Sequence, residues 1–469
     1  MSRLRPLQPG DLLEIEIEKM VPGGEGLGKV IGYPIFVPGG LPGDRGPVEI
    51  ISVKKDYARG LQKALWQESP QRVEAPCPIA KECGGCQWQE LDYSAQLEYK
   101  AALLSETLMR LGKFAETDLS TWIKPVMGMA LPWHYRNKAQ FPLQNLAGKV
   151  RGGFYAPRSH ELVPVDSCLL HPEGINQTLN FTEELLNQLK IQAYEPSTGQ
   201  GFIRHLVIRQ SKKTGEILLG LVCGQWETPG LNTLVESLTQ KLPHLVGIVQ
   251  NLNQDPGNRI LGKEQRILWG NETLNEVLGD FKFQISLPSF FQVNPEQTEV
   301  LYNTVKKMAD LKGSETLLDA FAGAGTIGLW LSQNCKQVIC IESLPEAIAD
   351  GKRNAALNEV SNLEFISGKV ENLIAQILKK QPLDLVILDP PRKGCAPEVL
   401  HALMETEISR LIYVSCNPAT LARDLEMLSS NYQITEIQPV DMFPHTHHLE
   451  TVVHLIRKQD VQPEAAEQN

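Results

Sequence analysis

The strongest constraint on the fold of this sequence is a series of short apolar runs between residues 316 and 416, each ending in polar residues or glycines. The runs read Thr316-Leu-Leu-Asp-Ala-Phe-Ala-Gly-Ala-Gly, Val338-Ile-Cys-Ile-Glu, Leu383-Asp-Leu-Val-Ile-Leu-Asp-Pro-Pro and Leu411-Ile-Tyr-Val-Ser-Cys. Stretches of helical character separate them, and this alternation is typical of a parallel sheet with helices on both faces. We therefore predict a doubly wound α/β domain over residues 289–458.

The first strand-to-helix turn of this domain contains Gly323, Gly325 and Gly328, a spacing that lets the backbone approach a ligand at the start of a helix. By itself the pattern also fits a dinucleotide-binding fold or a purely structural turn. Residues at two further strand ends narrow the choice among these interpretations of the turn. Glu342 ends the next strand, where such folds bind ribose hydroxyls, and Asp389 opens an Asp-Pro-Pro-Arg sequence. That sequence resembles motif IV of S-adenosylmethionine methyltransferases, so we expect a methyl-donor site.

A cysteine, Cys416, ends the next strand, and its thiol is therefore expected at the carboxyl edge of the sheet, where α/β folds place ligands. A lone cysteine is more often buried and inert. Here the polar, turn-forming neighbours Ser415 and Asn417 favour a reactive position, and residues 441–450 later supply a carboxylate together with three histidines. With no second cluster nearby, we expect these histidines to shape a loop or contact phosphate rather than bind a metal; they are His445, His447 and His448.

The first part of the chain, residues 4–64, has a β pattern of its own. Apolar and acidic residues alternate over residues 13–18, and turn clusters occur at Pro22-Gly-Gly and Pro38-Gly-Gly, which predicts several short strands in a small barrel. The segment resembles a TRAM domain, an OB-like five-stranded module found beside RNA-modifying enzymes. Such barrels bind single-stranded nucleic acid on a strand face, and the basic residues that could line it are Lys19, Lys29, Lys54, Lys55 and Arg59.

Between these two parts, over residues 65–288, we expect a mixed α+β central domain with a helix near residues 93–111 and paired strands at 203–210 and 216–222. It opens with a dense group of cysteines. Such thiolates favour a soft metal or an iron-sulfur cluster, and their spacing alone does not separate zinc from iron-sulfur. The candidate ligands are Cys77, Cys83 and Cys86, with Cys168 as a plausible fourth.

Composition limits what the chain can bind. The 55 Asp and Glu residues exceed the 45 Lys and Arg residues, for a formal charge of −10, so nucleic acid must be bound by local basic patches. No stretch resembles a targeting signal or has about 18 uncharged apolar residues, so we expect a soluble cytoplasmic protein without membrane contact. Residues 459–469 form a polar tail.

Several motifs together resemble the class I RNA (uracil-5-)-methyltransferase family. They are Ser289-Phe-Phe-Gln-Val-Asn, Asp319-Ala-Phe-Ala-Gly-Ala-Gly, Asp389-Pro-Pro-Arg-Lys-Gly, Val414-Ser-Cys-Asn-Pro-Ala-Thr and Asp441-Met-Phe-Pro-His-Thr-His-His-Leu-Glu. With the TRAM-like start and the cysteine group, the resemblance covers nearly the whole chain. It is closest to the bacterial 23S ribosomal RNA enzymes, because the bacterial tRNA branch typically lacks both extra features. The implied fold of the last domain is a Rossmann-like methyltransferase.

The resemblance also implies roles for individual residues. Cys416 matches the family's nucleophile and Glu450 its general base, while the positions matching contacts to S-adenosylmethionine are Gln292, Phe321, Glu342 and Asp389. The family pattern Cys-x5-Cys-Gly-Gly-Cys with a distant fourth cysteine implies a [4Fe-4S] cluster on Cys77, Cys83, Cys86 and Cys168. This chain has Phe321-Ala322 where the family usually has Tyr-Cys, so a phenolic hydroxyl is lost while ring packing on the cofactor can persist.

The chemistry of methyl transfer to uracil C5 explains why a cysteine and a carboxylate are needed. Uracil C5 is a poor nucleophile, so a thiolate adds to C6 first, and a carboxylate later removes the C5 proton. Cys395 lies several residues past the Asp-Pro-Pro strand end and is expected to be a bystander. The expected partner is RNA, 23S ribosomal RNA before tRNA, with no obligate protein partner. The alternative is a non-catalytic RNA-binding factor, against which the presence of both Cys416 and Glu450 argues.

Overall fold

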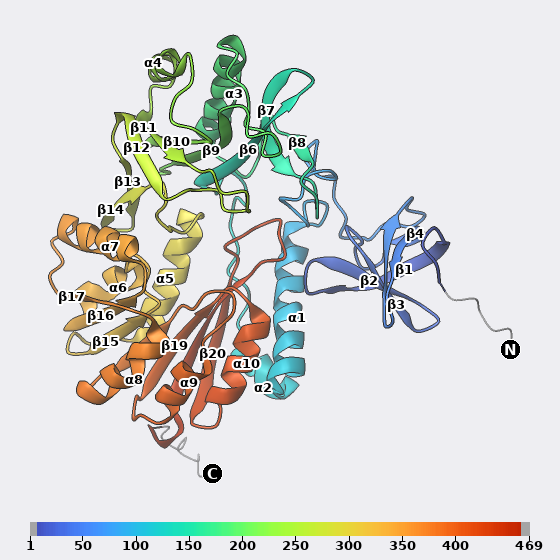
Figure 1. Ribbon diagram of the computed structural model, residues 1–469. Coiled ribbons are helices and arrows are strands. Elements are labelled where there is room, and N and C mark those ends of the chain that lie inside the picture. Colours follow the sequence, from blue (N-terminus) through green and yellow to red (C-terminus); the bar gives the residue numbers. More distant parts are fainter. Residues whose placement is uncertain (1–6, 461–469) are drawn as a thin grey trace.

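The structure is a computed structural model that describes residues 7–460. They form a small barrel, a central sheet and a sheet within residues 316–457, which is called the catalytic sheet below (Figure 1). Residues 4–6 of the expected first domain, and the expected polar tail from residue 461 onward, lie outside the described residues. In the part of the chain that is described, no helix has the length and apolar character needed to cross a membrane.

The N-terminal barrel is closed by five strands in the order β1-β2-β3-β5-β4, which confirms the expected OB-like TRAM barrel. The strands are β1 (Leu12–Val21), β2 (Glu25–Val30), β3 (Tyr33–Val37), β4 (Arg45–Val53) and β5 (Ala58–Gln62). The alternation in β1 points Ile15 and Ile17 inward, where they pack with Ile35, Val48 and other apolar side chains, and leaves the intervening glutamates toward solvent.

The central sheet has seven strands in the order β12-β11-β10-β9-β6-β7-β8. Their bounds are β6 (Lys138–Leu146), β7 (Lys149–Tyr155), β8 (Leu162–Pro164), β9 (Ile203–Gln210), β10 (Ile217–Cys223), β11 (Leu245–Leu252) and β12 (Glu264–Gly270). Helices α3 (Glu173–Gln188) and α4 (Leu231–Lys241) cover one face. The other face packs on the hairpin of β13 (Thr273–Leu278) and β14 (Phe281–Ser286), and through it on the catalytic sheet.

The catalytic sheet also has seven strands, in the order β17-β16-β15-β18-β19-β21-β20. They are β15 (Thr316–Ala320), β16 (Gln337–Glu342), β17 (Leu363–Ser367), β18 (Leu385–Leu388), β19 (Arg410–Ser415), β20 (Tyr432–Val440) and β21 (Glu450–Arg457). One face is covered by α5 (Pro295–Ala309), α6 (Thr326–Leu331) and α7 (Pro345–Leu357). The other is covered by α8 (Val370–Lys380), α9 (Pro397–Met404) and α10 (Pro418–Leu428). The doubly wound α/β fold is therefore confirmed.

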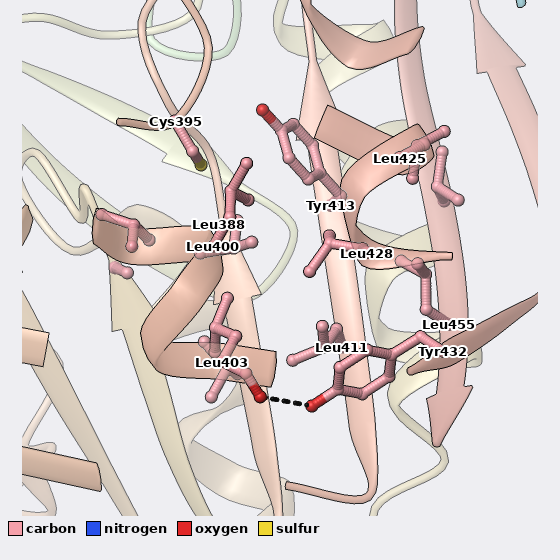
Figure 2. Close-up of a cluster of buried hydrophobic side chains, with 14 of the residues drawn as sticks. Leu388, Cys395, Leu400, Leu403, Leu411, Tyr413, Leu425, Leu428, Tyr432 and Leu455 are labelled. Carbon is pink, nitrogen blue, oxygen red and sulfur yellow. Dashed lines mark hydrogen bonds between the residues drawn. The ribbon is translucent and has the colours of Figure 1, made fainter. Parts of the chain in front are cut away.

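Two features of this domain differ from a simple parallel sheet. Strand β21 runs antiparallel between β19 and β20. In addition, α1 (Tyr93–Gly112) and α2 (Glu116–Trp122), which precede the central sheet in the sequence, pack on the catalytic sheet beside α10. Figure 2 shows the neighbouring part of this core, where Tyr432 donates a hydrogen bond of 3.1 Å to the carbonyl of Leu403.

Helix α1 combines a polar and an apolar half on its buried side. The carboxylate of Asp92 caps its start by accepting from the backbone N–H of Ser94 at 2.9 Å. The buried stripe at a spacing of four residues is polar at first and then apolar; it comprises Gln96, Lys100, Leu104 and Leu108. The leucines join the core beneath α10, so the polar half is left to contact the loop that precedes β21.

A buried ion pair joins helix α1 to the loop that precedes β21. The Lys100 ammonium lies 2.6 Å from a carboxylate oxygen of Asp441, both side chains are 0% exposed, and Lys100 also donates to the Phe443 carbonyl at 3.1 Å. The Tyr93 hydroxyl donates to the other Asp441 oxygen at 3.0 Å. Burial lowers the pKa of Lys100, and Asp441 opposes this shift. Two side chains of α1 thus bind Asp441 across the joint, and the Phe443 N–H of the same loop adds a hydrogen bond of 3.2 Å to it.

We predict that Lys100→Met lowers the free energy of unfolding by about 3–5 kcal/mol, because it leaves the Asp441 charge buried without its partner. The double variant Lys100→Met, Asp441→Leu should recover most of that loss, since no uncompensated charge remains. Urea unfolding followed by tryptophan fluorescence measures both. Equal destabilisation by the single and the double variant would contradict this account of the joint.

Candidate active site

The candidate nucleophile and base come from adjacent antiparallel strands. Cys416 directly follows β19, and Glu450 is the first residue of β21. In the register of this pair Ser415 lies opposite Thr451, so one further step places Cys416 opposite Glu450. The sequence motifs are 34 residues apart in number, and only the antiparallel direction of β21 brings its first residue to the carboxyl edge of the sheet.

Cys416 lies in a cleft of about 450 Å³ that is lined by the barrel, α1 and the catalytic domain. The barrel contributes its β1–β2 turn, Pro22 and Gly23, and α1 contributes one face from Lys100 to Leu111. The catalytic domain contributes Arg392, Cys416, Asn417, Pro418, Ala419, His447, His448 and Leu449. The volume is in the range of ordinary ligand pockets and is sufficient for a nucleobase.

The thiol of Cys416 is held in its protonated form. Burial raises its pKa to about 11, and the carboxylates of Glu450 and Asp389 add to the increase, whereas the Arg392 guanidinium opposes it. The chain therefore needs a change on substrate binding, or a base, before this thiol becomes a thiolate.

The two carboxyl groups are also shifted toward their protonated forms. Burial raises the pKa of Asp389 to about 7. It raises the pKa of Glu450 well above its ordinary value, with Asp389 adding to the shift and Arg392 opposing it. Once ionised, a carboxylate with a raised pKa binds a proton more tightly, which suits a group that must accept one from carbon.

The glycine-rich turn after β15 has the form of a cofactor cradle. The Gly323 N–H donates to Glu342 at 2.9 Å, and the other Glu342 oxygen accepts from the N–H groups of Ser343 and Leu344 at 2.6 and 2.8 Å. Gly323 has a φ of 57°, and a Cβ built there would meet nothing within 4 Å, so the space above the turn is open. Phe321 has a φ of 66°, a left-handed conformation that is strained for a side chain of this size.

A second observation at this turn fits a bound methyl donor. Within the described residues, the buried Oδ1 of Asp319 has no hydrogen-bond partner, while its Oδ2 accepts from the Gly328 N–H at 2.9 Å. Burial raises the pKa of Asp319 to about 7. Open space, an unpartnered acceptor and Glu342 at the next strand end match the needs of an adenosyl group and its ribose, so these residues fit S-adenosylmethionine.

The structure brings most of the expected site residues to one edge of the catalytic sheet. Phe321, Glu342, Asp389 and Cys416 follow or end the parallel strands β15, β16, β18 and β19, and Glu450 begins β21. Gln292 lies in the segment between β14 and α5, where its carbonyl accepts from the Asn137 side chain at 3.2 Å.

The four candidate cysteines lie elsewhere, around one cavity of about 280 Å³ that shares no residue with the cleft. Burial raises the pKa of Cys86 to about 12 and that of Cys168 to about 11, and the neighbouring cysteines add to both shifts. Among residues 7–460 no three His, Cys, Asp or Glu side chains stand close enough together to hold a single ion. Four thiols around one cavity nevertheless supply the donor set that a [4Fe-4S] cluster requires, and such a cluster spans more space than an ion.

The segment after the third cysteine holds the loop before Glu450. The N–H groups of Gln87 and Trp88 both donate to the His445 carbonyl, at 3.1 and 3.0 Å. The His445 ring stacks on Trp133 with centroids 3.7 Å apart, and its Nε2 lies 3.0 Å from the Pro132 carbonyl. Burial lowers the pKa of His445 to about 4, so a neutral ring shapes this loop. His447 and His448 instead line the cleft.

Sequence reasoning missed the part of the site formed by α1 and by the barrel turn. One signal was available, since Gln96 and Lys100 interrupt an otherwise apolar helical stripe and polar residues there need buried partners. The barrel turn offered another. Gly24 has a φ of 80°, and a Cβ built there would come within 3.1 Å of both His447 and Trp88, so a glycine permits this close approach.

The fold, the cradle and the thiol at the sheet edge define an S-adenosylmethionine-dependent methyltransferase with an N-terminal RNA-binding type of barrel. Comparison with known proteins agrees. Residues 249–458 match the model of the tRNA (uracil-5-)-methyltransferase family, and residues 6–61 match the TRAM domain. The chain belongs to the RNA (uracil-5-)-methyltransferase family.

Full-length relatives support this assignment. An uncharacterised RNA methyltransferase of Halalkalibacterium halodurans is 43% identical over 95% of this chain and 97% of the relative, and one of Clostridium acetobutylicum is 42% identical over 98% and 100%. Among solved structures, the Pyrococcus abyssi tRNA (uracil-54, C5)-methyltransferase in complex with S-adenosyl-L-homocysteine matches with a TM-score of 0.75. That protein is 27% identical, and the match covers 94% of this chain and all of the other.

The electrostatics of Cys416 predict how fast it reacts with iodoacetamide. Because the thiolate is the nucleophile, the rate should rise about tenfold for each pH unit between pH 7 and 10. Arg392→Gln should slow alkylation about threefold at pH 8, since it removes the charge that favours the thiolate. Mass spectrometry of the peptide containing Cys416 measures the rate.

The matched control is Lys393→Gln, which removes the next exposed cation along the chain and should leave the rate unchanged. Equal rates for the Arg392 and Lys393 variants would show that Arg392 does not act on this thiol.

Proposed function

We propose that this protein methylates C5 of a specific uridine in 23S ribosomal RNA, through a covalent bond between Cys416 and C6 of the uracil. The β19–β21 register carries the proposal, because it sets a buried carboxyl group opposite a thiol in a cleft large enough for a base. A thiol alone would serve many reactions, whereas a thiol with an opposed base at the edge of a methyl-donor cradle serves this one.

Cys416, Glu450 and Arg392 have separate roles in the proposed reaction. The Cys416 thiolate adds to C6, and the electron pair of the C5–C6 bond moves toward C5 and the O4 carbonyl, which makes C5 nucleophilic. When bound, S-adenosylmethionine supplies the electrophilic methyl group for C5. Glu450 then removes the C5 proton, and the electrons of that bond re-form the C5–C6 double bond and expel the Cys416 thiolate. Arg392 favours the anionic forms of both residues throughout.

Four residues would contact the methyl donor. We assign Glu342 to the ribose hydroxyls, Phe321 to packing against the cofactor, and Gln292 to a polar contact from the segment before α5. Asp389 stands between the cradle and the cleft, so it would contact both the donor and the uracil. Its position directly after β18, next to β19, supports this assignment.

The target base must leave its stack to reach Cys416, so we propose that the uridine is flipped into the cleft. Residues 4–64 and 65–288 would hold the surrounding RNA while residues 289–458 carry out the chemistry. Phe290 is 74% exposed and follows Ser289 near the cradle, which suits stacking on a base. As a soluble RNA enzyme the protein would act in the cytoplasm.

We further propose that Cys77, Cys83, Cys86 and Cys168 hold a [4Fe-4S] cluster. The reaction needs no redox step, and the peptide after Cys86 holds the loop before Glu450, so the cluster would stabilise this arrangement rather than react.

Anaerobically purified protein should contain about four iron and four sulfide per chain, and Cys83→Ser should lose both while also weakening RNA binding. Iron, zinc and sulfide analysis with a filter-binding assay measures this, with Cys335→Ala as the control outside the cavity. Stoichiometric zinc would replace the cluster by a zinc site, and full RNA affinity and methylation without metal would remove its role.

A second substrate class is favoured by a specific observation. A solved relative whose match covers 94% of this chain is a tRNA (uracil-54, C5)-methyltransferase, and tRNA would use the same catalytic residues. The preference for 23S ribosomal RNA is based on the combination of a TRAM barrel with the cysteine group, both of which this chain has.

The decisive experiment transfers labelled methyl from S-adenosylmethionine to ribosomal RNA and tRNA from cells lacking this gene, with nucleoside mass spectrometry. We expect 5-methyluridine in 23S ribosomal RNA, no product with Cys416→Ala, and normal product with the control Cys395→Ala. Glu450→Gln should slow turnover about 10²- to 10⁴-fold and accumulate an RNA–protein adduct on denaturing gels, because the C5 proton is not removed.

Label in tRNA alone would keep the mechanism and change the substrate. RNA binding with no label in either RNA would favour a non-catalytic RNA-binding factor.

A further inference from the structure

Three cationic side chains lie close together at the start of β6 and the end of β9, on the face of the central sheet that packs toward the catalytic domain. Lys138 lies opposite Arg209 in the β6–β9 register, and the Arg136 Nε donates to the Lys138 carbonyl at 3.2 Å. Within residues 7–460, none of the three forms an ion pair within 4 Å of a carboxylate, although Asp350 is near enough to favour the charged form of Arg209. This group is called the cationic trio below.

Holding the cationic trio together lowers the stability of the protein when no RNA is bound. Arg209 is only 2% exposed; it donates to the carbonyls of Leu287 and Ser289, and its Nε has no partner among the described residues. Burial lowers the pKa of Lys138 to about 7, and the charges of Arg209 and Arg136 lower it further in the same direction. Like charges held together away from water destabilise a fold, and an anion brought from outside would relieve this.

The trio is attached to the segment that carries Phe290. The Asn137 N–H, between Arg136 and Lys138, donates to the Val293 carbonyl at 2.8 Å, and Arg209 holds the Ser289 carbonyl. The exposed Phe290 ring therefore extends from backbone that is anchored on both sides to the strands of the trio. Cations beside an exposed aromatic ring are the combination with which proteins bind single-stranded RNA, the cations on phosphate and the ring on a base.

We propose that Lys138 binds the backbone phosphate of a nucleotide next to the flipped uridine, while Arg209 positions the Ser289–Phe290 segment. The proposal rests on the proposed function, since it assumes that RNA enters the cleft. The carboxylate of the methyl donor is another anion within the same chemistry, and the experiment separates it from the RNA phosphate.

The test compares Lys138→Met with Lys138→Arg and with the control Lys149→Met, which removes an exposed lysine at the β6–β7 turn of the same sheet. Filter binding to unmodified 23S ribosomal RNA and tRNA transcripts, at several salt concentrations, gives affinity and salt slope. Calorimetry gives the affinity for S-adenosyl-L-homocysteine, thermal unfolding reports the fold, and methylation of each RNA is assayed separately.

Lys138→Met should bind RNA about tenfold more weakly, with the slope of log affinity against log salt smaller by about one. Binding of S-adenosyl-L-homocysteine should not change, and thermal stability should not fall, because a repelled charge is removed. Lys138→Arg should retain RNA binding, and Lys149→Met should match the wild type.

Equal RNA affinity and salt slope for the Lys138→Met and Lys149→Met variants would overturn the proposal. So would weaker binding of S-adenosyl-L-homocysteine with an unchanged RNA slope, which would assign the trio to the donor's carboxylate. Failure of the wild type to methylate 23S ribosomal RNA would instead count against the proposed substrate, and the trio is then judged on the RNA that is bound.

Discussion

The loop that precedes the proposed base is held by the ion pair between Lys100 and Asp441, which is completely buried from solvent. It fixes α1 to the loop before Glu450, and other contacts converge on the same loop. Trp88, from the cysteine segment, donates its backbone N–H to His445 and its indole N–H to the barrel at Gly24, the latter at 3.1 Å. The barrel, the cysteine segment and α1 thus share one attachment point, and that point is adjacent in sequence to the proposed base.

Burial from water shifts the pKa values of ionisable groups in both regions that we assign to RNA chemistry, the cleft and the cationic trio. Around the cleft it favours neutral acids, since the pKa values of Cys416, Asp389 and Glu450 are all raised. At the cationic trio it disfavours the charge of Lys138. A polyanionic substrate would change both environments at once, because it brings negative charge to the trio and fills the cleft with a base.

The sequence predicted those features that are encoded locally. The barrel strands, the sheet-end motifs at Glu342, Asp389 and Cys416, and the helix near residue 93 each follow from patterns within about 20 residues. The remainder depends on contacts between distant segments. Neither the antiparallel direction of β21 nor the packing of α1 on the catalytic sheet has a local signature, and a buried lysine such as Lys100 is interpretable only when its partner is known. The apposition of Cys416 and Glu450 was therefore implied by family resemblance, and only the strand register gives it a physical basis.

The distance along the chain between Lys100 and Asp441, 341 residues, has a consequence for how the protein is made. Translation delivers α1, with a cation on the face that will be buried, well before it delivers Asp441 and β21. A nascent or truncated chain that ends before residue 441 contains Cys416, yet it lacks both the neutralising carboxylate and the proposed base. The proposed reactive pair is thus assembled only after residue 450 has been synthesised, because its two members are separated by β20 and the loop that Lys100 binds.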